Sequence, residues 1–189
     1  MKLLIALVLA FCFTPVQAAE VAGVKIDDSA RVAGADLKLN GAGLRSKAIF
    51  KVYAIGLYLH DKQATPAAVL SANGPKRVHL HMLRNVDAED FSEALAEGVK
   101  DNHSEAEVKA LAPRLAVLIA LMNEIKEAKT GLGIDLDWIP AAGTQVTIGG
   151  QVRGRPIAGE DFYQALLRIW LGERPVSGDL KKSLLGQGS

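Results

Sequence analysis

Residues 40–61 read NGAGLRSKAIFKVYAIGLYLHD, and this stretch decides which fold the chain adopts. From Ile49 to Leu59 the apolar residues fall on both alternating faces, which is typical of a strand that is covered on both sides. The stretch therefore predicts a strand in the middle of a sheet. It also places an arginine and a tyrosine close together in a segment that is otherwise apolar, and this needs a reason.

Arg45 and Tyr53 are the two polar residues in question. Arg45, Ile49 and Tyr53 share one parity, so a turn centred near Lys47 would put the guanidinium and the phenol on the same side of the sheet. Such a pair can clamp a carboxylate, because arginine supplies bidentate charge-assisted hydrogen bonds and tyrosine a directed donor. The absence of a side chain at Gly43 would let a ligand approach the backbone. The alternative is a surface arginine and a sheet tyrosine with its hydroxyl at the rim.

The remainder of the chain predicts strands, then helices, then strands, then helices, which is an α+β order. A Ser-x-x-Glu capping box starts the longest helix, and a proline is expected to bend or break it. A Gly-Gly pair predicts a hairpin between the last two strands. The expected elements are short strands over 21–60, a short helix over 65–71, a strand over 77–83, helices over 87–101 and 104–127, strands over 134–139, 144–148 and 151–155, and helices over 160–171 and 179–185.

The N-terminus reads MKLLIALVLAFCFTPVQAAE, in which Lys2 precedes an apolar run that ends at Val16-Gln17-Ala18. This pattern predicts a secretory signal peptide over residues 1–18 and a mature chain that starts at Ala19. The apolar run is shorter than the roughly 20 residues of a transmembrane helix. Cys12 lies inside the signal, so the mature chain would carry no disulfide. We expect a periplasmic or secreted protein with one domain over residues 19–189.

Charge argues against two classes of partner. Removal of residues 1–18 takes away one of the 22 basic side chains and leaves as many as the 21 acidic ones. A formally neutral chain gives no electrostatic case for binding nucleic acid or an anionic membrane, and no segment predicts a membrane span. The sequence leaves the oligomeric state open.

The chain shows no convincing catalytic, metal or cofactor motif. His79 and His81 share one strand face, but no HExxH helix or carboxylate at ligand spacing joins them. Asp135 and Asp137 also share a face, and a solvated strand edge is the expected setting for them. Neither glycine-rich stretch opens a helix as a phosphate-binding loop would, and no GxSxG nucleophile elbow is present. We predict no cofactor.

A stripe of large apolar residues marks one face of the helix expected over 160–171: Phe162, Leu166, Ile169 and Trp170. Such a stripe is usually packed in the core. It can also line a ligand cavity and remain part of the core.

Two segments, LNGAGLRSKAIFKVYAIGLYL and WIPAAGTQVTIGGQVRGRPIAGEDFYQALLRIWLGERPVSGDLKKSLLG, resemble the chalcone isomerase-like family, in particular its bacterial exported branch. The resemblance covers the chain from about Ala19 to Gly186. It implies an α+β fold with a large antiparallel sheet, helices packed on one side, and a ligand cleft between sheet and helices.

The family contains true chalcone isomerases, which close a chalcone to a flavanone, and relatives without activity. Arg45 matches the arginine that steadies the substrate phenolate in the enzymes. Tyr53 stands where the enzymes have a threonine, and Phe91 and Gly98 stand where they have a tyrosine and an asparagine. These three departures predict that the chain lacks isomerase activity.

Fatty-acid-binding relatives use an arginine and a tyrosine in these two motifs to hold a carboxylate. The resemblance thus implies a non-catalytic protein that binds a small apolar carboxylate, foremost a fatty acid, through Arg45 and Tyr53. Two alternatives stay open: an isomerase or lyase acting on a phenolic or enone substrate, and a partner-binding envelope protein with a vestigial cleft. The residues expected to line the cleft are Gly43, Phe91, Phe162 and Leu166.

Overall fold

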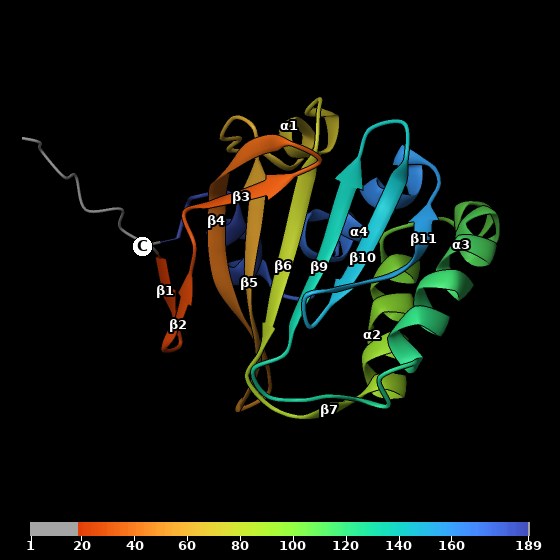
Figure 1. The fold of residues 1–189 in the computed structure, drawn as a ribbon, viewed down its shortest axis with the longest axis horizontal. Helices are drawn as coiled ribbons and strands as arrows, with labels where there is room; N and C mark the ends of the chain where they lie inside the picture. Colours follow the sequence, from red (N-terminus) through yellow and green to blue (C-terminus); the bar gives the residue numbers. More distant parts are fainter. Residues whose placement is uncertain (1–18, 189) are drawn as a thin grey trace, which may run out of the picture.

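The computed structural model describes residues 19–188, which form a curled seven-stranded sheet with helices behind it (Figure 1). All neighbouring strands of this sheet are antiparallel. In spatial order the strands are β11 (Gln151–Ile157), β10 (Gly143–Ile148), β9 (Gly133–Ile139), β6 (Lys76–Met82), β5 (Phe50–Leu59), β4 (Ala35–Lys47) and β3 (Ser29–Val32).

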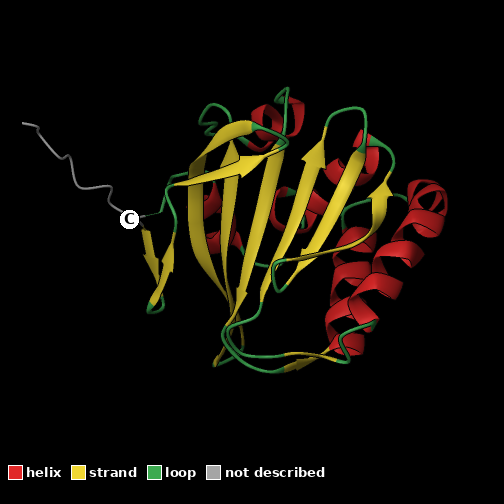
Figure 2. Cartoon of the chain, in the orientation of Figure 1, coloured by secondary structure: helices red, strands yellow, loops and turns green. Residues whose placement is uncertain are grey.

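The helices pack on one side of the sheet (Figure 2). They are α1 (Pro66–Ser71), α2 (Ala88–Asp101), α3 (Glu105–Asn123), α4 (Glu160–Leu171) and α5 (Gly178–Leu184). Two small ribbons complete the described chain: β1 (Ala19–Val21) with β2 (Val24–Ile26), and β7 (Val86–Asp87) with β8 (Glu127–Ala128). This arrangement is the α+β architecture expected from the order of the sequence blocks.

β5 is covered on both faces, as its apolar pattern predicts. On the helix side, Ile55 and Leu57 belong to the large core between sheet and helices. On the other side, Tyr58 packs in a second cluster with Ile26 of the β1–β2 ribbon. The prediction fails at the start of the stretch, because the chain turns there: Ile49 is 88% exposed and lies in the turn before β5.

The longest helix, α3, has the predicted capping box: the backbone N–H of Ser104 donates to the carboxylate of Glu107 at 2.8 Å. Pro113 lies inside α3, and the helix continues past it. It ends at Asn123, earlier than the expected residue 127, because the chain pairs there with a strand: Ala128 of β8 faces Val86 of β7.

The Gly149-Gly150 pair forms the predicted hairpin between β10 and β11. Both residues have positive φ, at 58° and 77°. Two consecutive positive φ values are what a tight two-residue hairpin turn requires, and glycine adopts them without strain.

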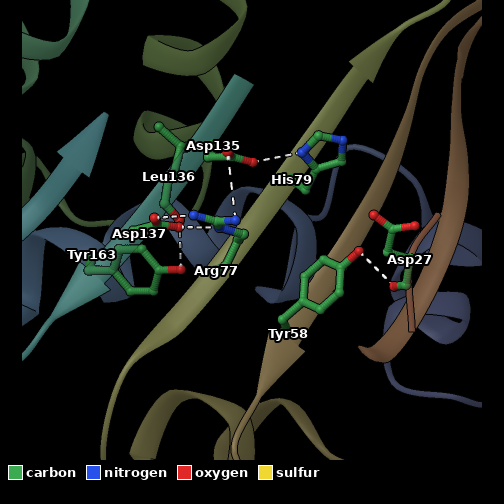
Figure 3. Close-up of polar contacts among 8 residues, drawn as sticks. All are labelled: Asp27, Tyr58, Arg77, His79, Asp135, Leu136, Asp137 and Tyr163. Carbon is green, nitrogen blue, oxygen red and sulfur yellow. Dashed lines mark hydrogen bonds and ion pairs between the residues drawn. The ribbon is translucent and has the colours of Figure 1, made fainter. Parts of the chain in front are cut away.

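The expected solvated edge at Asp135 and Asp137 is wrong. Both lie on β9, which is an interior strand between β6 and β10. Asp137 is only 6% exposed, and Arg77 donates to both its carboxylate oxygens, each at 2.6 Å (Figure 3). Burial raises the pKa of Asp137, and the hydrogen bonds and charge of Arg77 oppose that rise. A bidentate partner on the neighbouring strand is what lets a carboxylate be buried here.

His79 extends this polar network across the outer face of the sheet. Its Nδ1 lies 2.6 Å from a carboxylate oxygen of Asp135 (Figure 3). Its neighbour His81 lies on the same face and is also only partly buried, as the alternation of β6 predicts. The network therefore consists of paired polar side chains on the side of the sheet away from the helices.

Candidate functional site

Arg45 and Tyr53 are direct partners across β4 and β5, so their side chains lie on the same face of the sheet. The turn that joins the strands is at residues 48–49, and not centred near Lys47. A register shift leaves Val52 as an extra residue in β5. Without this bulge Arg45 would face Val52, and Tyr53 would point to the opposite side. The bulge therefore brings the two groups together.

A hydrogen bond from α4 fixes the Tyr53 hydroxyl. The indole N–H of Trp170 donates to the hydroxyl oxygen at 2.9 Å, and the ring of Phe91 packs edge-on against the phenol at 6.5 Å. Because the oxygen accepts from Trp170, the hydroxyl proton is free to point elsewhere. Burial raises the pKa of Tyr53, although Trp170 and Arg45 both act to lower it. The hydroxyl therefore stays protonated at neutral pH and acts as a donor.

Arg45 is half-buried beside Tyr53. Its Nη1 donates to the backbone carbonyl of Ser46, which uses only part of the five-donor guanidinium. Both residues line a cavity of about 520 Å³. At this point the sheet therefore presents a fixed positive charge and an oriented hydroxyl to the same space.

The cavity lies between the β4–β5 hairpin, the segment after β6, and α2. Its apolar lining residues are Phe50, Val52, Val86, Phe91, Ala94, Leu95, Ile169 and Val176. Its cationic lining residues are Arg45, Lys47 and Arg84, all from the sheet side. Its acidic lining residues are Asp87, Asp90, Glu93, Glu97 and Glu127, from α2 and the β7–β8 ribbon. One wall is thus basic and the facing wall acidic, with apolar side chains between them.

Sequence reasoning missed the acidic wall. Asp90, Glu93 and Glu97 follow one another at three- and four-residue spacing, which places them on one face of α2. That spacing was a visible signal.

The expected lining residues divide into two groups. Phe91 lines the cavity, whereas Phe162 and Leu166 are each 1% exposed in the core and are not among its lining residues. Gly43 lies against α5: a Cβ there would come within 2.7 Å of the Leu180 side chain. The glycine therefore makes room for the chain's own helix.

Gly98 has a packing role between α2 and α4. A Cβ at this position would lie 2.8 Å from Cγ2 of Ile169, so a larger side chain would push α4 away. An asparagine could not occupy the site in this arrangement. With Phe91 lacking a hydroxyl, the two α2 positions supply no hydrogen-bond donor, and Arg45 and Tyr53 supply theirs from the sheet.

Over residues 19–188, no group of three or more His, Cys, Asp or Glu side chains is placed to hold a metal ion. Among the helices described, none is both long enough and apolar enough to cross a membrane.

Comparisons with known proteins agree with this architecture. The structure is similar to the crystal structure of a fatty-acid binding protein from Arabidopsis thaliana, with a TM-score of 0.67 and 18% sequence identity over 86% of this chain and 92% of that one. At that identity the likeness shows a common fold. No curated protein matches the chain in sequence. The model of the family described as chalcone isomerase-like matches residues 18–186, and the chain therefore belongs to the chalcone isomerase-like family.

Proposed function

We propose that the protein binds a small apolar carboxylate, with a fatty acid as the first candidate, and performs no reaction on it. One observation carries this proposal: Arg45 and Tyr53 pair across adjacent strands at one cavity, and Trp170 leaves the tyrosine proton free to donate. A guanidinium and a hydroxyl donor together suit a carboxylate. The structurally similar Arabidopsis protein, described as fatty-acid binding, adds support.

The cavity has the size and lining for such a ligand. A volume of about 520 Å³ falls within the roughly 300–1,000 Å³ range of small-molecule sites. Each methylene removed from water contributes about 0.8 kcal/mol, so about ten give ~8 kcal/mol before association costs of several kcal/mol. Micromolar affinity is reachable by burial alone, and the polar pair then sets the orientation of the ligand.

Two features favour binding over isomerisation. Phe91 and Gly98 give a substrate no hydroxyl or amide from α2, and the raised pKa of Tyr53 keeps its hydroxyl from acting as a base at neutral pH. An open cavity also weighs against a vestigial cleft, which the chain's own side chains would fill.

The decisive experiment has two parts. Native mass spectrometry of protein purified from its own host should show a co-purified fatty acid. Calorimetry should then show binding of that acid, and much weaker binding of the primary alcohol with the same chain, which has no charge for Arg45. Equal affinity for acid and alcohol would contradict the carboxylate clamp. Turnover of a chalcone above its spontaneous rate would contradict the absence of catalysis.

We propose further that residues 1–18 are removed during export and that the protein acts in the periplasm or outside the cell. This segment lies outside the described residues, and the proposal rests on its sequence pattern. N-terminal sequencing of protein from fractionated host cells should begin at Ala19. Protein that starts at Met1 and stays in the cytoplasmic fraction would contradict export.

A further inference from the structure

The tip of the β4–β5 hairpin exposes apolar side chains at the mouth of the cavity. Ile49 is 88% exposed and Phe50 53% exposed, and they are neighbours in sequence. The other large apolar side chains exposed in the described chain are Val117 on α3 and Val152 on β11, and neither lines the cavity. Of the two tip residues, Phe50 also lines the cavity.

Cations surround this tip. Lys47 and Lys51 are exposed on either side of the turn, and the Arg84 guanidinium lies 4.7 Å from the centre of the Phe50 ring. Across residues 19–188, none of these three cations forms an ion pair with a carboxylate. The tip therefore combines exposed apolar groups with cations that form no direct ion pair, although the summed charge of the chain is close to zero.

We propose that this hairpin tip docks on an anionic lipid surface, with Ile49 and Phe50 entering the boundary between headgroups and acyl chains. Apolar side chains flanked by lysine and arginine are the composition that binds such interfaces. Two adjacent side chains form a point, far smaller than the ~800 Å² that a stable protein partner covers. The total charge of the chain, which gives no case for an anionic membrane, does not report that Lys47, Lys51 and Arg84 lie together at this tip.

The acidic wall of α2 sets the orientation. An anionic surface repels Asp90, Glu93 and Glu97, so the molecule approaches with the hairpin and keeps α2 away. Phe50, which lines the cavity, then lies against the lipid. That this contact loads the cavity with an acyl ligand rests on the proposed function, whereas the docking itself does not.

Sedimentation with lipid vesicles tests the docking. We expect binding to vesicles of phosphatidylcholine and phosphatidylglycerol in equal parts, and much weaker binding to phosphatidylcholine alone. Lys51→Gln should lower the affinity for the mixed vesicles about fivefold, and Ile49→Ser about tenfold. Neither residue lines the cavity, so affinity for a fatty acid in vesicle-free buffer should stay unchanged.

Two matched controls lie outside the tip, on β11 and on α3. Val152→Ser removes an exposed apolar side chain at the opposite edge of the sheet, and Lys109→Gln removes an exposed charge on α3. Both should bind vesicles as the wild type does. Circular dichroism should show equal melting for all four variants, since each replaces an exposed side chain.

Three results would overturn the proposal: no preference for the anionic vesicles, tip variants that bind as the controls do, or a dimer in size-exclusion chromatography that Ile49→Ser abolishes without any vesicle binding. The two measurements distinguish failure of the docking proposal from failure of the proposed function. Fatty-acid affinity without vesicle binding removes only the docking proposal, and vesicle binding without fatty-acid affinity removes only the proposed function.

Discussion

Arg45 and Tyr53 contribute differently to a bound carboxylate. Arginine brings a permanent charge and hydrogen bonds worth roughly 1.5–3 kcal/mol each, whereas a neutral hydroxyl donor contributes about 1 kcal/mol net. Both groups reach the cavity from the sheet. Tyr53→Phe also removes the acceptor of the buried Trp170 N–H, so its effect on stability must be measured beside its effect on binding.

Arg45→Ala should therefore weaken fatty-acid binding more than Tyr53→Phe. Calorimetry on both variants measures the difference, and circular dichroism checks that each keeps its fold. Arg45→Lys serves as the control, because it keeps the charge and loses the bidentate geometry, so its affinity should fall between those of wild type and Arg45→Ala. Undiminished affinity in Arg45→Ala would rule out the clamp, and an unfolded Arg45→Ala would mean that the residue is structural.

Trp170 positions the Tyr53 hydroxyl, and its effect can be separated from its packing. Trp170→Phe removes the N–H donor and keeps an aromatic ring in the core, so we expect roughly 1 kcal/mol less stability and weaker ligand binding. Trp170→Ala would leave a hole and should cost roughly 3–5 kcal/mol in the free energy of unfolding, because the ring is buried.

A double-mutant cycle identifies the positioning role. In a Tyr53→Phe background, Trp170→Phe should no longer change ligand affinity, because the hydroxyl that it orients is gone. Additive losses in affinity would show that Trp170 acts on the cavity by packing alone.

Among the helices and strands, the sequence predicts elements that carry a repeating pattern or a local motif. It misses irregularities that depend on how one strand pairs with another. The alternation in β5 and the capping box of α3 identify those elements, because side-chain direction and cap chemistry are local. The bulge at Val52 leaves no local signature, since it follows from how β5 pairs with β4. The predicted turn centre near Lys47 was also wrong, because the turn lies at residues 48–49, and it is the bulge that puts Arg45 and Tyr53 on one face.

The cavity lining shows the same division. Phe91 lines the cavity, and the sequence pointed to it because it stands where the family's enzymes have a tyrosine. The approach of α5 to Gly43 joins segments far apart in the chain, and nothing near Gly43 in the sequence predicts it. Trp170 was visible as a buried aromatic, yet its partner Tyr53 belongs to a strand that precedes it by more than a hundred residues.

The docking of α5 on β4 yields a test at this scale. A Cβ at Gly41 would lie 2.1 Å from the carbonyl oxygen of Ser183, so Gly41→Ala must displace the helix. We expect a loss of roughly 1–3 kcal/mol in the free energy of unfolding, measured by urea denaturation. Gly178→Ala is the control within α5 itself, because its Cβ would meet no atom within 4 Å. Equal midpoints for the two variants would mean that α5 is not held in this position.

For the whole molecule, the pair between α3 and α4 predicts how stability depends on pH. Arg114 donates to both carboxylate oxygens of Asp161, at 2.7 and 2.6 Å, and these hydrogen bonds lower the pKa of Asp161. A lowered pKa in the folded state adds stability above the usual carboxyl pKa of about 3.9, and this contribution is lost as pH falls through the lower folded value.

Asp161→Asn should therefore reduce stability by roughly 0.2–1 kcal/mol at neutral pH, the range for an exposed pair. Below about pH 4 the difference in stability between Asp161→Asn and the wild type should shrink. Urea denaturation across the acid range measures it. A difference that stays constant down to the lowest pH would show that the carboxylate charge makes no contribution.

The two edges of the large sheet bear on how the folded protein behaves in a crowded solution. β3 has only four residues, and β11 carries Pro156, which has no N–H to offer to another strand. Arg155 is exposed beside this proline, and Gly154 has a positive φ of 58° that makes the edge irregular. A short strand at one end and a charged, proline-bearing strand at the other both disfavour strand addition from a neighbouring molecule. The sheet can thus stay open-edged without serving as a template for amyloid-like growth.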